Sequence, residues 1–540
     1  MTTASYPRKD DEAGLRGRLR PLAGAAGILM AGFIASRVLG LVRNAVLASY
    51  FGDSPQYEAY VAAIAVPDAV FQVLAGGVMG AAFIPVFTRY LAAGDEEDAW
   101  RLSSSAINLA ALLTGGLALL LIVFARPVMA VVVSGRPDLQ EMATGLVRIM
   151  LVSPVIFAVS GFATSILNTF QRFFWAALAP LMYNLGIIAG TVLLHARWGI
   201  YGVAIGVAAG ACGHLLIQAP GLVQIRARYW PVLDWRAPGV REVGKLMLPR
   251  MFGLGVAQAN QLITTVFLAS FLVAGSMAYL NYAWLVLMVP LGVFGMAVST
   301  AVFPTLARQS AAGESAAMGE LFGLTLRMIL YLTIPAAVGL VVLGEPIVRL
   351  LFERASFTPD VTRATALAVG VYALGLPGHS VVEIVDRAFY ALHDTRTPVK
   401  AAALAVLLNV LLSAAVVLGA LHGPLPADRA YAGLALANAA AAWVEASLLV
   451  VWLRWRSGDL GLRGLGRDLL RYVAAALLMG AVLSGLDRGL LGALDRRGLG
   501  GELVAVGTLI VVGLATYLAG GLLLRCREPR LLLSLLRRGR

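Results

Sequence analysis

The chain is poor in the residues that most soluble enzymes depend on. Only 14% of its 540 residues are charged, and lysine occurs three times, as Lys9, Lys245 and Lys400. The two cysteines, Cys212 and Cys526, are far apart and do not form a metal-ligand motif or a disulfide framework. No glycine-rich loop ending in Gly-Lys-Ser or Gly-Lys-Thr occurs, which excludes ATP hydrolysis by a P-loop. We therefore expect no metal and no cofactor.

Long apolar stretches take the place of the missing charge. Hydrophobic residues make up 59% of the chain and the mean hydropathy is +0.81, a balance typical of integral membrane proteins. A spanning helix needs about 20 apolar residues, and by this criterion the chain contains about fourteen candidates. Their centres lie near Ala35, Val70, Leu113, Val155, Ile187, Val207, Leu262, Val293, Leu332, Leu376, Val406, Ala439, Leu478 and Val511. The segments between them are too short for a soluble catalytic domain, so we expect an all-α integral membrane protein.

Basic residues are concentrated in both tails and in two connections. An even number of spans puts both tails on one side of the membrane, and the positive-inside rule places them in the cytoplasm. The same rule assigns the basic connections 226–245 and 454–471 to the cytoplasm, and the nearly uncharged connections 52–56 and 274–276 to the outside. The net charge of +13 therefore reflects topology, and no nucleic-acid partner is expected. The predicted location is the plasma membrane.

Two segments near the ends of predicted spans repeat each other. Residues 85–95 (PVFTRYLAAGD) and 304–314 (PTLARQSAAGE) share a proline, an arginine, Ala-Ala-Gly and an acidic residue without a gap. Six spans separate them, so both copies have the same orientation, as in transporters whose two parallel lobes rock around a substrate. Chance similarity of alanine-rich helix ends is the alternative. The predicted division is a basic tail (1–20), an N-terminal six-helix lobe (21–228), a C-terminal six-helix lobe (229–456) and two extra helices with a basic tail (457–540).

Arg37 and Arg43 lie inside the first apolar stretch, where a spanning helix ordinarily carries no charge. An arginine at membrane depth costs roughly 2.5–3.5 kcal/mol on insertion scales, which indicates a polar partner, a water-filled cavity or an anionic ligand. The two side chains project about 120° apart around the helix. The guanidinium suits phosphate because it donates paired hydrogen bonds and keeps its charge. A structural ion pair with Glu58 or Asp68 is the alternative.

Further polar side chains fall within the predicted spans. Glu383, Asp386 and Arg387 lie near the inner end of the tenth span, where a gating latch or ion pair is as well supported as a ligand site; the spacing of Glu383 and Arg387 suits an intrahelical pair. Arg250 follows Pro249 at the start of the seventh span and is a candidate for the cavity, or an interfacial anchor. Single amides are expected to form hydrogen bonds between helices; they are Asn184, Gln258, Asn260, Asn281, Asn409 and Asn438.

Three blocks of the sequence together carry a family resemblance. The first is Ser36-Arg37-Val-Leu-Gly40-Leu-Val-Arg43 with Phe51-Gly52, and the second runs from Tyr282-Ala283 through Pro290-Leu-Gly292-Val-Phe-Gly295 to Phe303-Pro304. The third combines Leu351-Phe352-Glu353-Arg354 with Phe389-Tyr390-Ala391 and Asp394-Thr395-Arg396-Thr397-Pro398. In this order, over the first ten to eleven spans, the blocks resemble the lipid II flippase family, MurJ or MviN.

The resemblance implies fourteen spans in two six-helix lobes, with two extra helices that shape a groove for a polyprenyl tail. It implies the multidrug/oligosaccharidyl-lipid/polysaccharide exporter superfamily, and transport of lipid II from the inner to the outer leaflet. It places the cavity arginines that engage the lipid diphosphate at Arg37 and Arg43, and the acidic residue of the second helix at Glu58. A coupling ion or the membrane potential, and the cell-wall synthesis machinery, are the further expected partners.

The chain departs from the family pattern at two places. Where many members carry arginine after the second-helix proline it has Phe71-Gln72, and where they carry an Asp-Arg pair in the eighth span it has Trp284-Leu285. The expected substrate-binding set is therefore Arg37, Arg43, Arg250, Glu58 and Gln72, with Asp68 in an ion pair or gate. The alternatives are a flippase for another polyprenyl-diphosphate saccharide, a drug/cation antiporter of the same superfamily, and a polyprenyl-phosphate glycosyltransferase, which would need larger outer loops.

Overall fold

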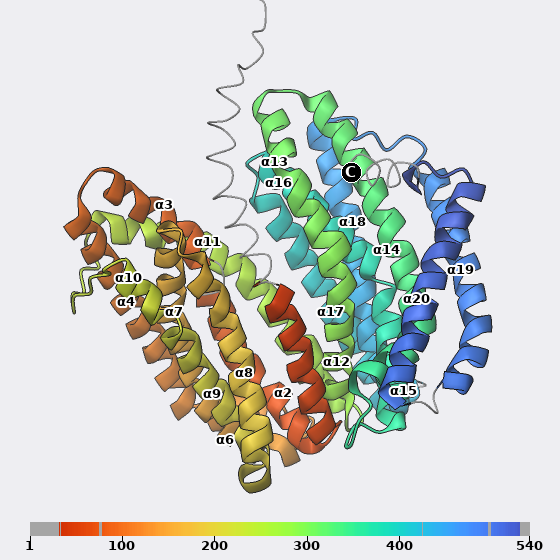
Figure 1. Ribbon diagram of the computed structural model, residues 1–540, viewed down its shortest axis with the longest axis horizontal. Helices are drawn as coiled ribbons and strands as arrows, with labels where there is room; N and C mark the ends of the chain where they lie inside the picture. The colour runs from red at the N-terminus through yellow and green to blue at the C-terminus, as the bar shows by residue number, and fades with distance from the viewer. Residues whose placement is uncertain (1–31, 33, 75–77, 424, 495–497, 530–540) are drawn as a thin grey trace, which may run out of the picture. The chain divides into compact units, whose positions relative to one another are not determined.

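The structure is a computed structural model that describes residues 32, 34–74, 78–423, 425–494 and 498–529, and over these ranges it contains helices and no strand (Figure 1). Residues 34–51 form the first helix. It is followed by α2 (Pro55–Leu74), α3 (Val78–Ala92), α4 (Glu96–Val123), α5 (Ala125–Val132), η1 (Pro137–Leu139), α6 (Gln140–Met150), α7 (Val152–Thr169), α8 (Phe173–Trp198), α9 (Ile200–Leu216), α10 (Ala219–Gln224) and α11 (Pro238–Gln261). The remaining elements are η2 (Leu262–Leu268), η3 (Ala269–Phe271), α12 (Ser276–Pro290), η4 (Leu291–Met296), α13 (Ala297–Ala311), α14 (Ser315–Phe352), α15 (Pro359–Ala373), α16 (Leu376–Ala391), α17 (Arg396–His422), η5 (Ala427–Arg429), α18 (Ala430–Ser457), α19 (Leu465–Leu494) and α20 (Gly498–Leu523).

The helices agree with the predicted spans. Within the described ranges, 12 helices are long and apolar enough to cross a membrane, and the pair α15 and α16, bent by 45°, makes up to 13. The helix at residues 34–51 contains the centre of the first predicted span, and the beginning of that span lies outside the described residues. The expectation of an all-α membrane protein with about fourteen spans is thereby confirmed.

The chain divides into two compact units. Unit 1 comprises the described residues up to Leu47 together with Ala63–Met129 and Gln140–Gln258. Its core contains an aromatic cluster in which Phe83 of α3 meets Phe162 of α7 edge to face, with ring centres 5.2 Å apart. Phe87 packs in the same way on Trp100 of α4. These rings tie α3, α4 and α7 together, because edge-to-face aromatic pairs add directional attraction to the area they bury.

Helices α8 and α9 meet along a seam of glycines. A Cβ atom at Gly186 would lie 2.3 Å from the Cα of Gly210, and one at Gly190 would lie 2.4 Å from the carbonyl oxygen of Gly202. No side chain fits at these distances, so the two backbones touch directly. Close contact through small residues spaced four apart is a common way for helices to associate in a bilayer, where apolar surface alone gives little drive for association.

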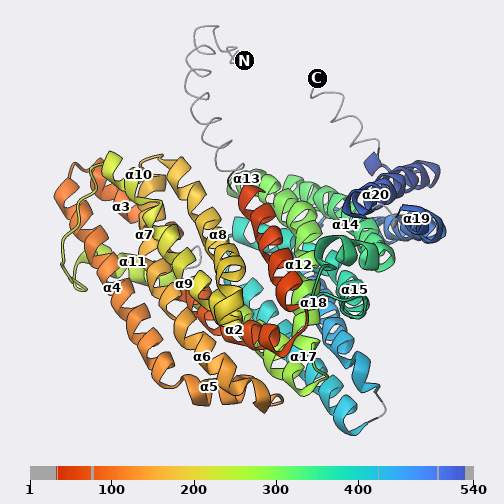
Figure 2. The ribbon, with the colours of Figure 1, turned by 60° about the horizontal axis from the view of Figure 1, so that its bottom comes forward.

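Unit 2 comprises Ala48–Ala62, Ala130–Leu139 and the described residues from Ala259 onward. Its longest helix, α14, packs against α19 and α20, which lie side by side in both views (Figures 1 and 2). Three buried tyrosines join these helices: the Tyr517 hydroxyl donates to the carbonyl of Tyr331 at 2.8 Å, and the Tyr472 ring lies 5.3 Å from that of Tyr331. The last two helices are thus anchored within the core of unit 2.

The repeated segments end their helices in the same way. After α3, the amides of Ala93, Gly94 and Asp95 donate to the carbonyls of Arg89, Leu91 and Tyr90; after α13, the amides of Ala312, Gly313 and Glu314 donate to Arg308, Ser310 and Gln309. Gly94 and Gly313 have φ of +85° and +73°, a conformation that favours glycine. The sequence repeat is therefore also a repeat of backbone geometry.

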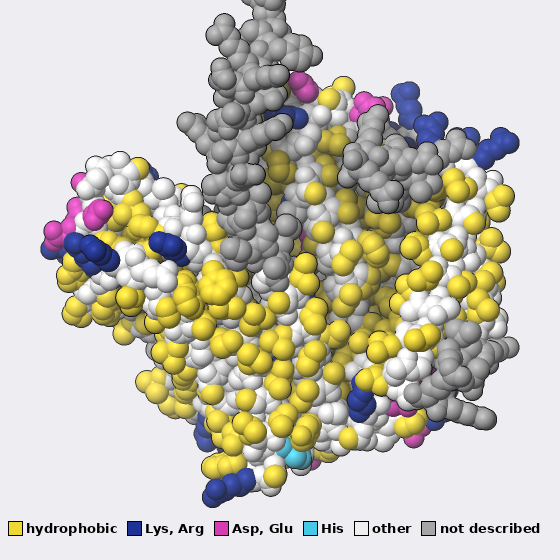
Figure 3. All heavy atoms as spheres, viewed as in Figure 1, with side chains coloured by type: hydrophobic (Ala, Val, Ile, Leu, Met, Phe, Trp, Pro, Cys, Tyr) yellow, Lys and Arg dark blue, Asp and Glu magenta, His cyan; other side chains and the backbone are white. Residues whose placement is uncertain are grey.

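The surface carries the pattern expected of a protein in a bilayer. Figure 3 shows hydrophobic side chains over much of the visible face, while arginine and lysine side chains form only a few small groups on it. Leu193, Leu477 and Val511 are examples of large apolar side chains that are more than half exposed. Contiguous apolar surface of this extent is stable in contact with lipid rather than with water.

Candidate functional site

The first helix carries two arginines at different degrees of exposure. Arg37 is exposed, whereas Arg43 is half-buried, with Nη2 donating to the Oδ1 of Asn44 at 3.2 Å. The Nε of Arg43 is buried and has no hydrogen-bond partner among the described residues. The helix passes close to α8 between them, where a Cβ at Gly40 would lie 3.7 Å from the Oδ1 of Asn184. A small residue at this crossing brings the helix close to α8.

Asp68 and Gln72 lie one turn apart on α2, after the proline at position 67. The Asp68 carboxyl is near enough to Arg43 for the two charges to attract each other. Asp68 is solvent-accessible and Gln72 is half-buried. The structure thus brings Arg43 and Asp68 into one electrostatic group within unit 1, and a structural ion pair between them stays a prediction.

Glu58, at the start of α2, is engaged by protein groups on both carboxylate oxygens. Its Oε2 accepts from Nη1 of Arg136 at 2.7 Å, and its Oε1 accepts from the amide of Met277 at 3.2 Å. The Glu58 side chain is only 2% exposed. Arg136 also pairs with Asp138 at 2.8 Å, and this hydrogen bond, together with the charge of Glu58, raises the pKa of Arg136 above its ordinary value. The substrate-binding role of Glu58 stays a prediction.

Arg136 itself was not among the residues singled out from the sequence. It lies between α5 and η1, in a connection that links two apolar stretches. Breaking a buried ion pair by removing one partner leaves an uncompensated charge, which costs about 3–5 kcal/mol. In the sequence, Arg136 stands between Gly135 and Pro137. This pattern predicts a turn but does not indicate which carboxylate the arginine pairs with.

The charged residues of α16 form a second group within unit 2. Arg387 pairs with Glu383 at 3.4 Å on the same helix. The Oδ1 of Asp386 is buried without a hydrogen-bond partner among the described residues. Glu445 of α18 belongs to the same group, since it is close enough to Asp386 for the two negative charges to repel each other. Glu445 was missed by the sequence analysis, and the gating role of the group stays a prediction.

Arg250 lies in α11, and its side chain is outside the described residues. Most of the single amides behave as expected of residues that join helices. Asn409 of α17 donates to Asn260 of α11 at 2.9 Å, and Asn438 of α18 contacts the imidazole of His379 at 3.1 Å. Asn184 differs, since it donates to the carbonyl of Pro180 one turn earlier in its own helix. No cluster of potential metal ligands occurs among the described residues.

Comparison with known proteins gives the family. The family model described as "Lipid II flippase MurJ" matches residues 47–492. The chain belongs to the MurJ lipid II flippase family. It is 30% identical over 521 residues to the probable lipid II flippase MurJ of Vibrio cholerae, a match that covers 93% of this chain and 96% of that protein. The protein of the same description from Haemophilus influenzae is 31% identical over 437 residues, with 77% and 82% covered.

Solved structures agree with the MurJ family. A structure described as "Lipid II flippase MurJ, inward closed conformation" superposes with a TM-score of 0.74 at 27% identity, covering 92% of this chain and 98% of that one. A MATE multidrug transporter in an inward-facing conformation superposes with a TM-score of 0.67 at 13% identity, covering 79% and 96%. The second likeness shows a shared fold alone. The protein is therefore a multi-pass membrane transporter of the MurJ family.

Proposed function

We propose that this protein moves lipid II from the inner to the outer leaflet of the plasma membrane by alternating access. Family membership supports the substrate, because the relatives in Vibrio cholerae and Haemophilus influenzae are described as probable lipid II flippases. The matching helix ends of α3 and α13 support the mechanism, since repeated halves are the framework within which two lobes rock around a substrate. The shared fold with a multidrug transporter does not select a substrate.

The observation that carries the proposal is the arginine pair of the first helix. A buried donor without an acceptor costs about 1–3 kcal/mol, and the Nε of Arg43 is such a donor. A diphosphate oxygen supplies the missing acceptor and at the same time neutralises the charge. Arg37 lies less than two turns away and is exposed, so its guanidinium lies within reach of a second phosphate oxygen. Two fixed guanidinium forks suit a diphosphate better than a single cation.

The neighbouring residues take supporting roles in the proposal. Asp68 holds Arg43 when no lipid is bound and releases it to the diphosphate. Gln72 donates a neutral hydrogen bond from the next turn of α2, and Arg250 adds a third positive charge. Glu58 joins the start of α2 to the start of α12 through Arg136 and the amide of Met277, and we propose that it contacts the lipid when this link opens during the transport cycle.

Topology, lobes and energy supply follow the same family pattern in our proposal. Both termini lie in the cytoplasm, the two lobes are residues 21–228 and 229–456, and residues 457–540 guide the polyprenyl tail. The group at Glu383, Asp386 and Arg387 gates the C-terminal lobe. A coupling ion or the membrane potential supplies the energy, and the cell-wall synthesis machinery consumes the lipid on the outer face. Anchoring of α19 and α20 by Tyr331, Tyr472 and Tyr517 supports a guiding role, because a guide must stay fixed to the lobe.

The test is complementation in cells depleted of their own lipid II flippase. Arg37→Ala is expected to abolish growth and to leave lipid II in the inner leaflet, as measured with an enzyme that cleaves lipid II only from the outside. The expected loss is large, because the variant removes a charge-assisted contact to the transported group. Membrane insertion and protein level are measured in the same cells.

Arg101→Ala is the matched control. Arg101 is an exposed arginine of α4 that pairs with Glu97 of the same helix, and its loss should leave growth unchanged. Full complementation by Arg37→Ala would overturn the assigned role of the arginine pair. If the wild-type protein moves another polyprenyl-diphosphate saccharide while lipid II stays in the inner leaflet, the substrate is that saccharide and not lipid II.

A further inference from the structure

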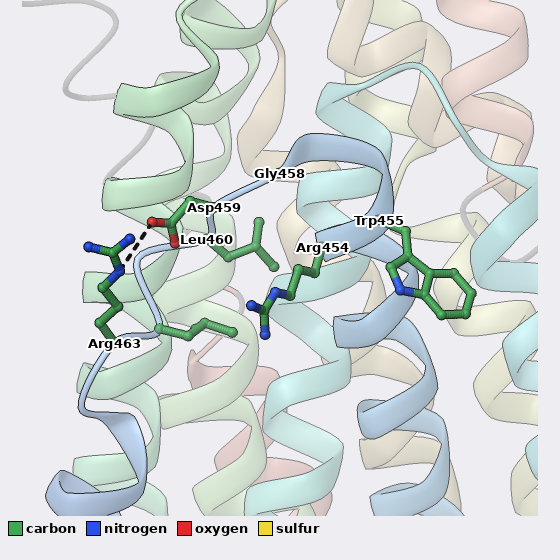
Figure 4. Close-up of a pocket in the computed structure, with 7 residues that line it drawn as sticks. Arg454, Trp455, Gly458, Asp459, Leu460 and Arg463 are labelled. Carbon is green, nitrogen blue, oxygen red and sulfur yellow. Dashed lines mark ion pairs between the residues drawn. The ribbon is translucent and has the colours of Figure 1, made fainter.

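A pocket of about 470 Å³ lies where α18 ends and the chain turns toward α19. Its lining residues are Arg454, Trp455, Gly458, Asp459, Leu460, Leu462 and Arg463. Figure 4 shows the Arg454 side chain pointing from the last turn of α18 into this space, toward Leu460. Its volume is within the range of about 300–1,000 Å³ that is usual for small-molecule sites. The pocket therefore has room for a small polar group.

Arg454 differs from the arginines around it in having no carboxylate partner among the residues that the structure describes. Arg456 pairs with Asp394 at 3.0 Å and Arg327 with Asp468 at 3.2 Å. Within the described part of the chain, no hydrogen bond or ion pair engages the guanidinium of Arg454. Its position in the last turn of α18 suits a cation, because the carbonyl end of a helix is negative. The guanidinium N–H groups of Arg454 are nevertheless free to donate hydrogen bonds to an anion.

The one carboxylate that lines the pocket is used elsewhere. Asp459 accepts from the amide of Gly461 at 3.0 Å and lies 3.8 Å from the Nε of Arg463. Figure 4 shows this pair on the side of the loop away from Arg454. The charge that faces the pocket is consequently positive, since the acidic side chain is turned toward another arginine.

The wall formed by the loop is held in place by α14. A Cβ atom at Gly319 would lie 2.2 Å from the carbonyl oxygen of Asp459, so the loop backbone touches the helix directly. Arg327 donates from Nη2 to the carbonyl of Arg463 at 2.8 Å. Leu460 is only 2% exposed and forms part of the same core. A preformed wall lowers the entropic cost of binding a ligand.

The surroundings of the pocket indicate a lipid. Trp455 is 78% exposed, and an exposed tryptophan beside arginine at the end of a spanning helix is typical of the membrane interface. Basic pockets between helices on the cytoplasmic side are suited to anionic head groups. The pocket joins one free guanidinium to apolar side chains, which complements an amphiphile better than a free inorganic ion.

We propose that this pocket binds the phosphodiester head group of an anionic glycerophospholipid from the cytoplasmic leaflet. Arg454 donates to the phosphate oxygens, Leu460 and Leu462 contact the glycerol and the start of the acyl chains, and Trp455 marks the depth of the interface. The bound lipid joins the last turn of α18 to the connection that follows it. The site is separate from the arginine pair of the first helix and does not depend on the identity of the transported lipid.

The test measures lipid binding by the purified full-length protein with native mass spectrometry. Dioctanoyl phosphatidylglycerol is the probe, and dioctanoyl phosphatidylcholine, which has no net charge, is the reference. Wild type should bind the anionic lipid more tightly, and Arg454→Gln should weaken the first binding event about tenfold, equivalent to about 1.4 kcal/mol. Arg454→Lys should restore part of the loss, since lysine keeps the charge but lacks the fork.

Arg429→Gln is the matched control, because Arg429 is an exposed arginine at the other end of α18. It should bind the anionic lipid as wild type does. A thermal unfolding curve for each variant shows that it is folded. Equal binding by wild type and a folded Arg454→Gln overturns the proposal. Displacement of the lipid by millimolar inorganic phosphate would identify a site for free anions. Displacement by lipid II would identify a binding site on the transport path. Either result also overturns the proposal.

Discussion

Two connecting segments each pack against a long helix, one on α4 and the other on α14, and different interactions hold them there. In unit 1, residues 226–237 are held to α4 by side chains: Asn108 donates to the carbonyl of Val232 at 2.8 Å, and Ser104 accepts the amide of Trp230 at 3.1 Å. In unit 2, residues 458–464 lie against glycines of α14. The first segment is therefore joined to its helix through neutral side chains, whereas the second combines direct backbone contact with the charged side chain of Arg327.

The two arrangements occupy equivalent places in the repeat. Gly323 and Arg327 of α14 follow Ser104 and Asn108 of α4 by 219 residues, the separation of Pro85 and Pro304. A serine and an amide in one copy thus correspond to a glycine and an arginine in the other. The difference shows that the repeat preserves the place of contact while its chemistry changes. Direct backbone contact leaves no room for substitution, whereas a hydrogen-bonding side chain can be replaced at moderate cost.

The largest expected effect is that of a methyl group added at the backbone contact. Gly319→Ala places a Cβ 2.2 Å from the carbonyl oxygen of Asp459, and the loop must move away. Such overpacking costs typically about 1–3 kcal/mol. The midpoint of thermal unfolding in detergent should fall. Gly339→Ala is the matched control in the same helix, because nothing lies within 4 Å of its Cβ position, and alanine there should be neutral or stabilising. Equal midpoints for the two variants would contradict the contact.

A second effect, of comparable size, is expected from the charged contact of unit 2. Arg327→Met removes one of the arginine partners of Asp468 and the donor to the carbonyl of Arg463, and both groups are left with fewer hydrogen bonds. Arg327 is 17% exposed and Asp468 is 25% exposed, so the expected loss in the free energy of unfolding is about 1–3 kcal/mol. The measurement is chemical unfolding in detergent.

Asn108→Ala is the corresponding change in unit 1. It removes hydrogen bonds between neutral groups, and those with the Val232 carbonyl and the Tyr229 hydroxyl are both exposed. The expected cost is about 0.5–1.5 kcal/mol. The comparison between the two segments predicts that Arg327→Met lowers the free energy of unfolding more than Asn108→Ala does. An equal or greater loss in Asn108→Ala would show that the two fastenings are energetically alike.

The smallest effect concerns the repeated helix ends. Arg89 pairs with Glu242 through two hydrogen bonds, one of them 3.0 Å long from Nη1 to Oε1. Arg89 thereby holds the pKa of the Glu242 carboxyl below its ordinary value of 4.5. A lowered carboxyl pKa stabilises the folded protein above the ordinary value, and the contribution is lost as the pH falls through the folded-state pKa. Glu242→Gln should lower the unfolding midpoint slightly at pH 7 and have no effect at a pH below that pKa.

Arg308 is the equivalent arginine in the second copy, and within the described ranges no ion pair engages it. Arg308→Gln should therefore leave the unfolding midpoint unchanged at both pH values. The pair at Arg89 is exposed on both sides, so its contribution is screened and small. A pH-dependent difference in Arg308→Gln as large as in Glu242→Gln would remove the distinction between the two copies.

The spans and the repeat could be predicted because both depend on short stretches of sequence. An apolar run of about 20 residues specifies a spanning helix by its length alone, and the segments 85–95 and 304–314 end their helices with the same glycine turn. The fastening of the connections could not be predicted in this way. Nothing in the sequence near Gly319 indicates that Asp459, far away along the chain, lies against it.

The candidate site shows the same limit. Arg37 and Arg43 stand out because a charge is rare in an apolar run, so their own segment is sufficient to find them. Arg136 and Glu445 were missed because each acts on a carboxylate in a distant segment, Glu58 for the one and Asp386 for the other. Such pairs depend on how helices pack, which apolar spacing does not determine.

The glycine seam between α8 and α9 has a consequence for the order of assembly. The two helices are consecutive, separated by Gly199 alone, and their contact therefore joins residues that are near one another along the chain. Contacts that are local in sequence close small loops and form fast. During synthesis this helical hairpin can close as soon as its second arm has entered the bilayer. The closed hairpin then presents a preformed packing surface to the spans that are synthesised after it.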